Sequence, residues 1–207
     1  MLAMAGMMMG VATGGGGGFT SLPGIDFRHT AAYVTDGADD TYCLAELYPT
    51  TRASSGGRSA TFGWQSALTG DAGLDSNATY DPRIAGANSC TNSGAGTARV
   101  FQLDLPDGAG TYAVELAFGA YSGQAACHLD ILDSDGTTAL LTFDSTALGG
   151  SMYLDANNTL YTNTTWPTSE TPKSVTVSGS HIYVRIGGAT SEGAQSPVAY
   201  FKAQRTA

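Results

Sequence analysis

Two neighbouring runs of alternating side chains constrain the fold of this chain more than any other feature. Apolar residues occupy every second position in residues 99–105, and the alternation resumes in residues 111–119. A strand with one buried face has this period of two, whereas a helix has a period near 3.6. The residues between the runs, 106–110, read PDGAG and are typical of a turn. We therefore predict two antiparallel strands joined as a β-hairpin.

Similar short apolar runs, separated by turn residues, recur along the chain, and the three-four spacing of amphipathic helices is almost absent. Further strands are expected at 25–34, 41–48, 60–65, 127–132, 137–143, 159–165, 173–177, 180–187 and 197–204. This pattern predicts an all-β fold, an antiparallel β-sandwich of the jelly-roll type. Composition is uniform from Ile25 onward, so we expect one domain over 25–207, preceded by an extended Gly/Met-rich arm and linker over 1–24.

The charge of the chain excludes some partners. The 207 residues hold 9 Lys and Arg against 18 Asp and Glu, a formal net charge of −9. Nucleic acids and anionic membrane surfaces are recognised through clustered cations, so neither is an expected partner. We also expect no membrane span, since no apolar stretch approaches the roughly 18 residues that one requires.

The first predicted hairpin resembles a known family. Residues 99–108, RVFQLDLPDG, and 112–119, YAVELAFG, are similar to the central hairpin of malectin-like and galactose-binding-like carbohydrate-binding domains. Residues 25–27, 61–64 and the final runs 182–187 and 200–203 resemble other strands of these domains, so the resemblance covers about 25–204. It implies a jelly-roll sandwich that is often appended to enzymes and often binds sugars. The insertion at 66–98 departs from compact members of the family.

Aromatic residues in predicted loops are the candidate sugar contacts, because a flat ring stacks on the C–H face of a pyranose. The candidates are Trp166, Tyr161, Tyr121 and Tyr80, with Tyr48 as a further loop aromatic. Trp166 lies in a polar Thr/Asn-rich run and is expected to be the most exposed, whereas Trp64 is expected in the core. For each candidate, a packing role is the alternative.

Acidic loops suggest a structural calcium ion, since calcium is bound by several carboxylate or carbonyl oxygens. Asp36, Asp39 and Asp40 are the candidate ligands, and residues 133–136 form a second acidic loop. Neither loop matches the EF-hand pattern, and Asp-Gly is also an ordinary hairpin turn. No other cofactor is expected.

No catalytic motif is present, so we expect a protein that is not an enzyme. His29, His128 and His181 lie in or beside predicted strands, and each is expected on a sheet face. Ser180, His181 and an aspartate could form a triad, but no local signature supports one. The cysteines Cys43, Cys90 and Cys127 are either three small buried residues or include one bridge, perhaps between Cys43 and Cys90. No C-x-x-C pair suggests zinc.

The first 18 residues carry no charged side chain, and five of the six methionines lie in the first nine. A secretory signal would begin with Lys or Arg, and none precedes Arg28. The segment is either a disordered tail or, as we hypothesise, an arm whose residues 1–13 dock on a partner chain. The apolar docking residues would be Met1, Leu2, Met4, Met7, Met8, Met9 and Val11.

Together these features favour a non-catalytic virion structural protein, a phage capsid decoration or tail appendage protein. Its arm would bind other virion proteins, and its jelly roll would project outward and contact host glycans. The protein would be a homo-oligomer, in which many copies make weak glycan contacts effective. The alternative is a free carbohydrate-binding module of a secreted or cell-surface glycan-active system. A minor alternative is an accessory domain of an esterase or lyase.

Overall fold

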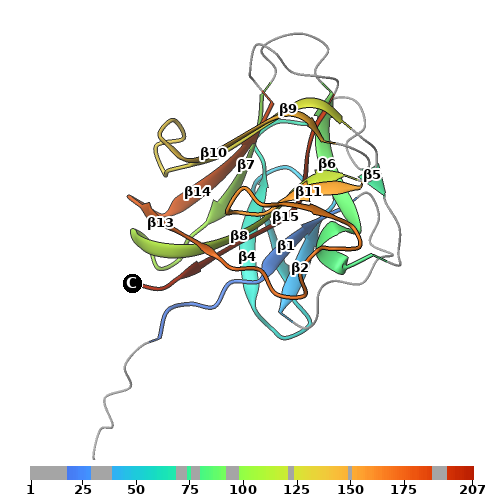
Figure 1. The fold of residues 1–207 in the computed structure, drawn as a ribbon. Helices are drawn as coiled ribbons and strands as arrows, with labels where there is room; N and C mark the ends of the chain where they lie inside the picture. Colours follow the sequence, from blue (N-terminus) through green and yellow to red (C-terminus); the bar gives the residue numbers. More distant parts are fainter. Residues whose placement is uncertain are drawn as a thin grey trace, which may run out of the picture.

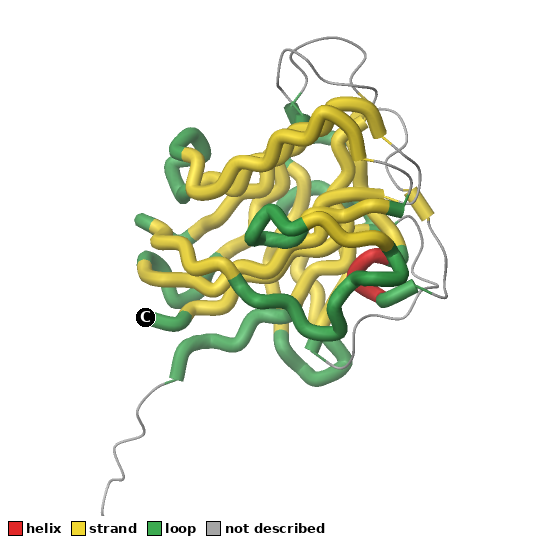
Figure 2. Tube along the Cα trace, in the orientation of Figure 1, coloured by secondary structure: helices red, strands yellow, loops and turns green. Residues whose placement is uncertain are grey.

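The computed structural model describes residues 18–28, 39–68, 74–75, 80–91, 98–120, 124–148, 151–187 and 195–207. These residues form strands and loops with one short 3-10 turn, η1 (Pro82–Ile84) (Figure 2). The strands pack as two sheets into a β-sandwich, which confirms the predicted all-β sandwich class (Figure 1). No helix in the described part of the chain is long and apolar enough to cross a membrane.

One sheet has nine strands. They are β1 (Gly24–Phe27), β2 (Asp40–Cys43), β5 (Leu74–Asp75), β6 (Gly86–Thr91), β8 (Gly110–Ala120), β11 (Met152–Leu154), β12 (Leu160–Thr162), β13 (Lys173–Val177) and β15 (Gln195–Arg205). Strands β8 and β15 pair along their length in the middle of this sheet. On its other edge, β8 pairs with β13 and β11. On its other edge, β15 pairs with β1 and β6. All pairs are antiparallel except β1 with β2.

The other sheet has six strands in the order β10-β9-β14-β7-β4-β3, all antiparallel. They are β3 (Thr50–Ala53), β4 (Ser59–Trp64), β7 (Arg99–Asp104), β9 (Gln124–Leu132), β10 (Ala139–Leu148) and β14 (His181–Ile186). Alternation along β14 sends Ile182, Val184 and Ile186 into the core, so His181 and Tyr183 face outward. The outer face of this sheet is therefore a polar surface, and the candidate site lies on it.

The predicted hairpin over 99–119 is wrong, although both strands exist. β7 belongs to the six-stranded sheet and β8 to the nine-stranded sheet, so the turn at 106–109 carries the chain from one sheet to the other (Figure 1). Phe101 and Leu103 of β7 meet Val114 and Leu116 of β8 in one core cluster. Two strands that face each other across a core have the same alternation as two strands that pair edge to edge.

The final runs, which form β14 and β15, are likewise consecutive strands that lie in different sheets. The strands predicted over 127–132 and 137–143 exist as β9 and β10, and they pair as antiparallel neighbours in a hairpin. Four strands were not predicted: β3, β5, β6 and β11. β5, η1 and β6 lie within the insertion 66–98, whose described residues complete the nine-stranded sheet.

A loop between β12 and β13, residues 163–172, which we call the strap, crosses the outer face of the nine-stranded sheet (Figure 1). The Arg83 guanidinium holds it in place by donating to the Pro167 carbonyl oxygen at 2.6 Å. Glu170 lies 3.4 Å from Arg83 and accepts a hydrogen bond from the backbone N–H of Leu116 at 3.3 Å. This bond satisfies a donor of β8 just beyond the end of its pairing with β13.

The described part of the leader lies against the sandwich. Leu22, expected in the linker, is 3% exposed and belongs to the core cluster. Its backbone N–H donates to Gln204 in β15, and the backbone N–H of Thr20 donates to Asp107 in the turn after β7. The sandwich therefore includes residues that precede Ile25.

Candidate functional site

Outward-facing polar and aromatic side chains gather where β7 and β14 run side by side. In the register of this pair, His181 lies opposite Asp104 and Tyr183 lies opposite Gln102. The rings of His181 and Tyr183 stack, with centroids 6.2 Å apart and an interplanar angle of 21°. Tyr48 joins the group from the segment before β3, because its hydroxyl contacts Asp104.

The Asp104 carboxylate is the centre of this group. The Tyr48 hydroxyl donates to it, lying 3.2 and 3.1 Å from its two oxygens, and Gln102 Nε2 donates to Oδ1 at 3.1 Å. His181 Nε2 lies 3.5 Å from the same oxygen. The Asp104 side chain is nevertheless 31% exposed, so these contacts hold it in one orientation and leave it accessible to a ligand.

Both tyrosines of the site keep their protons at neutral pH. The pKa of Tyr48 is raised, first by burial and then by the negative charge of Asp104. Burial and Asp104 raise the pKa of Tyr183 in the same way. Tyr48 therefore keeps the proton that it donates to Asp104, and Tyr183 keeps a hydroxyl donor at the end of an apolar ring.

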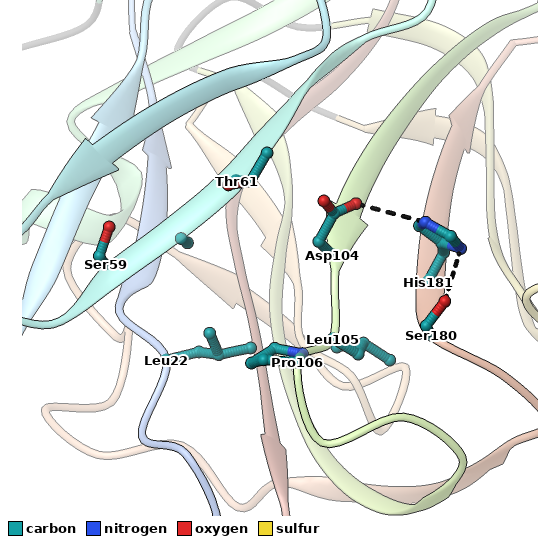
Figure 3. A pocket seen from close by; sticks show the side chains of 9 residues that line it. Leu22, Ser59, Thr61, Asp104, Leu105, Pro106, Ser180 and His181 are labelled. Carbon is teal, nitrogen blue, oxygen red and sulfur yellow. Dashed lines mark hydrogen bonds and ion pairs between the residues drawn. The ribbon is translucent and has the colours of Figure 1, made fainter.

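A pocket of about 380 Å³ opens beside Asp104 (Figure 3). Its polar lining is Ser59, Thr61, Asp104, Ser180 and His181, and its apolar lining is Leu22, Ala60, Leu105 and Pro106. Figure 3 shows Asp104, His181 and Ser180 linked in a chain on one side, with Leu22 and Pro106 below them. The volume is within the range of small-molecule sites.

The Ser180, His181 and Asp104 side chains also form the serine–histidine–aspartate sequence that a hydrolase uses. Ser180 Oγ lies 3.2 Å from Nδ1 of the adjacent His181, and Nε2 of that ring faces Asp104. Acyl transfer also requires N–H donors for the oxyanion. The backbone N–H of His181 is already donated to Ser134 Oγ, and the N–H of Leu105 is donated to the Ser180 carbonyl oxygen. Neither of these two N–H groups is therefore free to act as an oxyanion donor.

The expected exposure of Trp166 is wrong. Trp166 is 8% exposed and packs edge-on against Tyr153 and Tyr161, with centroids 5.9 and 5.6 Å away. Its hydrophobic area outweighs the polarity of the surrounding sequence, so the ring anchors the strap to the nine-stranded sheet. Tyr161 and Tyr80 are half-buried against the same cluster, and Tyr121 lies outside the described residues. The sugar-contact role of these four residues stays a prediction.

The calcium prediction involves residues with other partners. Asp39 Oδ1 lies 3.3 Å from Arg58 Nε, and the buried Asp40 accepts hydrogen bonds from the Gly24 N–H and the Tyr200 hydroxyl. Asp36 lies outside the described residues, and within them no group of three His, Cys, Asp or Glu side chains could hold a metal ion. The calcium site stays a prediction.

Cys43 is a free thiol, 0% exposed, whose pKa is raised mainly by burial. The suggested Cys43–Cys90 bridge is therefore wrong, and Cys43 packs as a small core residue. Several of the predicted residues lie outside the described part of the chain. They are the side chains of Cys90 and Cys127, the arm residues Met1–Val11, and His29.

A second polar group lies further along the same sheet face. His128 Nε2 lies 2.8 Å from Asp130, its Nδ1 contacts Asp144, and Arg185 and Thr142 also donate to Asp130. Burial acts to lower the pKa of His128, but the hydrogen bonds to Asp144 and Asp130 outweigh it and raise this pKa. These contacts join β9, β10 and β14, so His128 is a sheet-face histidine with a structural role.

Most of the Asp104 site was missed from sequence. The sequence predicts Tyr48 as a loop aromatic and offers Ser180 and His181 as members of a triad. For Asp104, Gln102 and Tyr183 it predicts only a place in a strand. Their alternation with core residues indicated outward-facing side chains, and only the strand register brings them together. Comparison with protein-family models, curated proteins and solved structures gives no match to this chain.

Proposed function

We propose that this β-sandwich is a non-catalytic glycan-binding domain whose binding site is centred on Asp104. The observation that carries the proposal is the carboxylate itself, fixed by Tyr48 and Gln102 yet 31% exposed at the wall of an open pocket. The resemblance of residues 25–204 to malectin-like and galactose-binding-like domains supports the same class of ligand.

The chemistry of the group suits a neutral sugar. A carboxylate accepts hydrogen bonds from sugar hydroxyls, and the nearby Gln102, His181 and Ser180 side chains offer further polar groups. Tyr48 and Tyr183 supply aromatic surface for the C–H groups of the ring. An acidic sugar is disfavoured, because its carboxylate would approach Asp104 and add to a net charge of −9.

A carboxylate-to-amide substitution tests the proposal. Asp104→Asn keeps the shape of the side chain and removes the charge, and we expect it to weaken glycan binding by about tenfold or more, since hydrogen bonds to charged groups are the strong ones. The measurement is binding to a glycan array, followed by titration calorimetry with the best ligand. Asp39→Asn, on the other sheet, is the matched control and should bind like wild type.

Two outcomes would oppose this proposal. Equal binding by wild type and Asp104→Asn would remove Asp104 from the site. Hydrolysis of acetylated substrates that disappears in Ser180→Ala would assign the same residues to catalysis.

The virion role is a companion proposal that rests on sequence. The uncharged, Met-rich residues 1–18 and the Gly-rich sandwich support an arm-anchored capsid decoration or tail appendage protein, in which many copies would strengthen weak glycan contacts. The free carbohydrate-binding module is the alternative, and it requires only the Asp104 site. A virion protein would lose incorporation into particles without its arm, whereas a free module would lose nothing.

A further inference from the structure

The pocket beside Asp104 combines an apolar floor with a polar rim. Leu22, Ala60 and Leu105 line its floor, and each is at most 3% exposed, so only a small part of each core side chain faces the pocket. Pro106, which lies between Leu22 and Leu105 in Figure 3, is exposed and offers the more accessible apolar surface of the lining. A ligand that presented only hydroxyl groups would leave them without partners against this floor.

The rim offers an acceptor next to donors. Asp104 accepts hydrogen bonds, and the Ser180 hydroxyl lies beside it. When His181 Nδ1 donates to Ser180 Oγ, the Ser180 hydroxyl proton is free to donate to a ligand. A ligand group that suits both parts of the pocket needs an N–H or O–H donor, an adjacent acceptor and a small apolar end within a few bonds.

We propose that the pocket binds the acetamido group of an N-acetylated amino sugar, an inference that rests on the proposed glycan-binding function. The amide N–H donates to the Asp104 carboxylate, the amide oxygen accepts from Ser180 Oγ, and the methyl group lies against the exposed Pro106 above the floor residues Leu22, Ala60 and Leu105. The sugar ring then extends from the pocket toward Tyr48 and Tyr183.

The parent sugars and the free amine each lack part of this match. Glucose and galactose place a hydroxyl where the amide nitrogen would lie, so they keep a donor for Asp104. They lack the carbonyl oxygen and the methyl group, and they gain no burial of apolar area beside Pro106. Glucosamine keeps a donor for Asp104 but has neither the carbonyl oxygen nor the methyl group. We therefore expect N-acetylated sugars to bind at least about tenfold more tightly than their parents.

The test is a titration of the full chain with methyl glycosides of N-acetylglucosamine, N-acetylgalactosamine, glucose, galactose and glucosamine, followed by NMR. We expect the backbone amides of Ser59, Ala60, Leu105 and His181 to shift, and the acetyl methyl group to show the strongest saturation transfer. Ser180→Ala should reduce the preference for the N-acetylated sugars severalfold. Ser174→Ala, which removes an exposed hydroxyl from β13 on the other sheet, is the matched control.

The outcomes separate this inference from the proposed function. Equal binding of glucose and N-acetylglucosamine, shifts that avoid the pocket, or an unchanged preference in Ser180→Ala would overturn the acetamido assignment while leaving glycan binding in place. If no sugar on the panel or on a glycan array binds, both proposals fail.

Discussion

At the scale of single residues, neighbours in space decide what a side chain does. Asp104 resembles any outward-facing strand residue in the sequence, yet its carboxylate is held by Tyr48, 56 positions away, and faces His181 in the adjacent strand. Trp166 shows the opposite case, because a polar sequence context suggested exposure and packing against Tyr153 and Tyr161 buries it. Local composition is a weak guide to burial when tertiary contacts cover the residue.

Glu170 gives a prediction at this scale. Burial raises its pKa to about 8, from an ordinary value of 4.5, despite the nearby Arg83. Arg83 is already paired with Asp81 at 2.9 Å and stands 3.4 Å from Glu170, so it offsets the burial only in part. The carboxyl group is therefore largely protonated at neutral pH, although it lies within ion-pair distance of a guanidinium.

The sign of the pH effect follows from linkage. Between pH 4.5 and about 8 the folded protein keeps a proton at Glu170 that the unfolded chain has released, so the free energy of unfolding falls as the pH rises. The slope from one such group approaches about 1.4 kcal/mol per pH unit. Glu170→Gln removes this titration, and the stability lost between the two ends of this range should shrink by a few kcal/mol, on the order of the shift itself.

Urea unfolding of wild type and Glu170→Gln at both ends of this pH range measures the effect. Asp39→Asn removes an exposed carboxylate and should leave the pH dependence as in wild type. A Glu170→Gln protein with the pH dependence of wild type would show that Glu170 is ionised in the folded state.

At the scale of elements, alternation located strands but did not pair them. The runs 99–105 and 111–119 are both strands, yet they face each other across the core. The connection between β9 and β10 is similarly short and makes a true hairpin. Both arrangements bury one face of each strand, so the pattern of apolar residues is the same. Strand β6, with the sequence GANSCT, lacks the alternation altogether and forms because it pairs with an edge of β15.

Gly63 gives a prediction for β4 and the Tyr48 segment. Its φ is +148°, and a Cβ atom there would lie 2.5 Å from the backbone nitrogen of Tyr48. This close approach lets the Tyr48 N–H donate to the Trp64 carbonyl oxygen at 3.0 Å and brings the phenol to Asp104. Gly63→Ala should therefore lower the free energy of unfolding by on the order of 3 kcal/mol and weaken glycan binding.

Chemical denaturation and the glycan titration described above measure both effects. Gly57→Ala is the matched control, because Gly57 also has a positive φ, +82°, but nothing lies within 4 Å of its added Cβ. It should cost only about 1 kcal/mol and leave binding unchanged. Equal losses of stability in the two variants would mean that the contact with Tyr48 is unimportant.

At the scale of the whole molecule, the sandwich is expected to fold without the arm. Among the described residues, which start at residue 18, the core cluster begins at Leu22. Deletion of residues 1–13 should therefore change the free energy of unfolding by no more than about 0.5 kcal/mol. Under the virion proposal the same deletion abolishes incorporation into particles. Thermal unfolding and the protein content of purified particles give the two measurements, and normal incorporation of the truncated chain would refute the docking role of the arm.

Sequence was sufficient for the class of the fold, because a period of two, repeated between turn residues in a chain with little helical patterning, has few solutions other than a sandwich or barrel. It also indicated which faces of β7 and β14 point outward. The tertiary structure alone decided which strands became neighbours, and therefore that Asp104, Tyr48 and His181 share one site while Trp166 is buried. The physical reason is that side-chain periodicity specifies a face, whereas partners across a sheet or a core are selected by packing among residues distant in the chain.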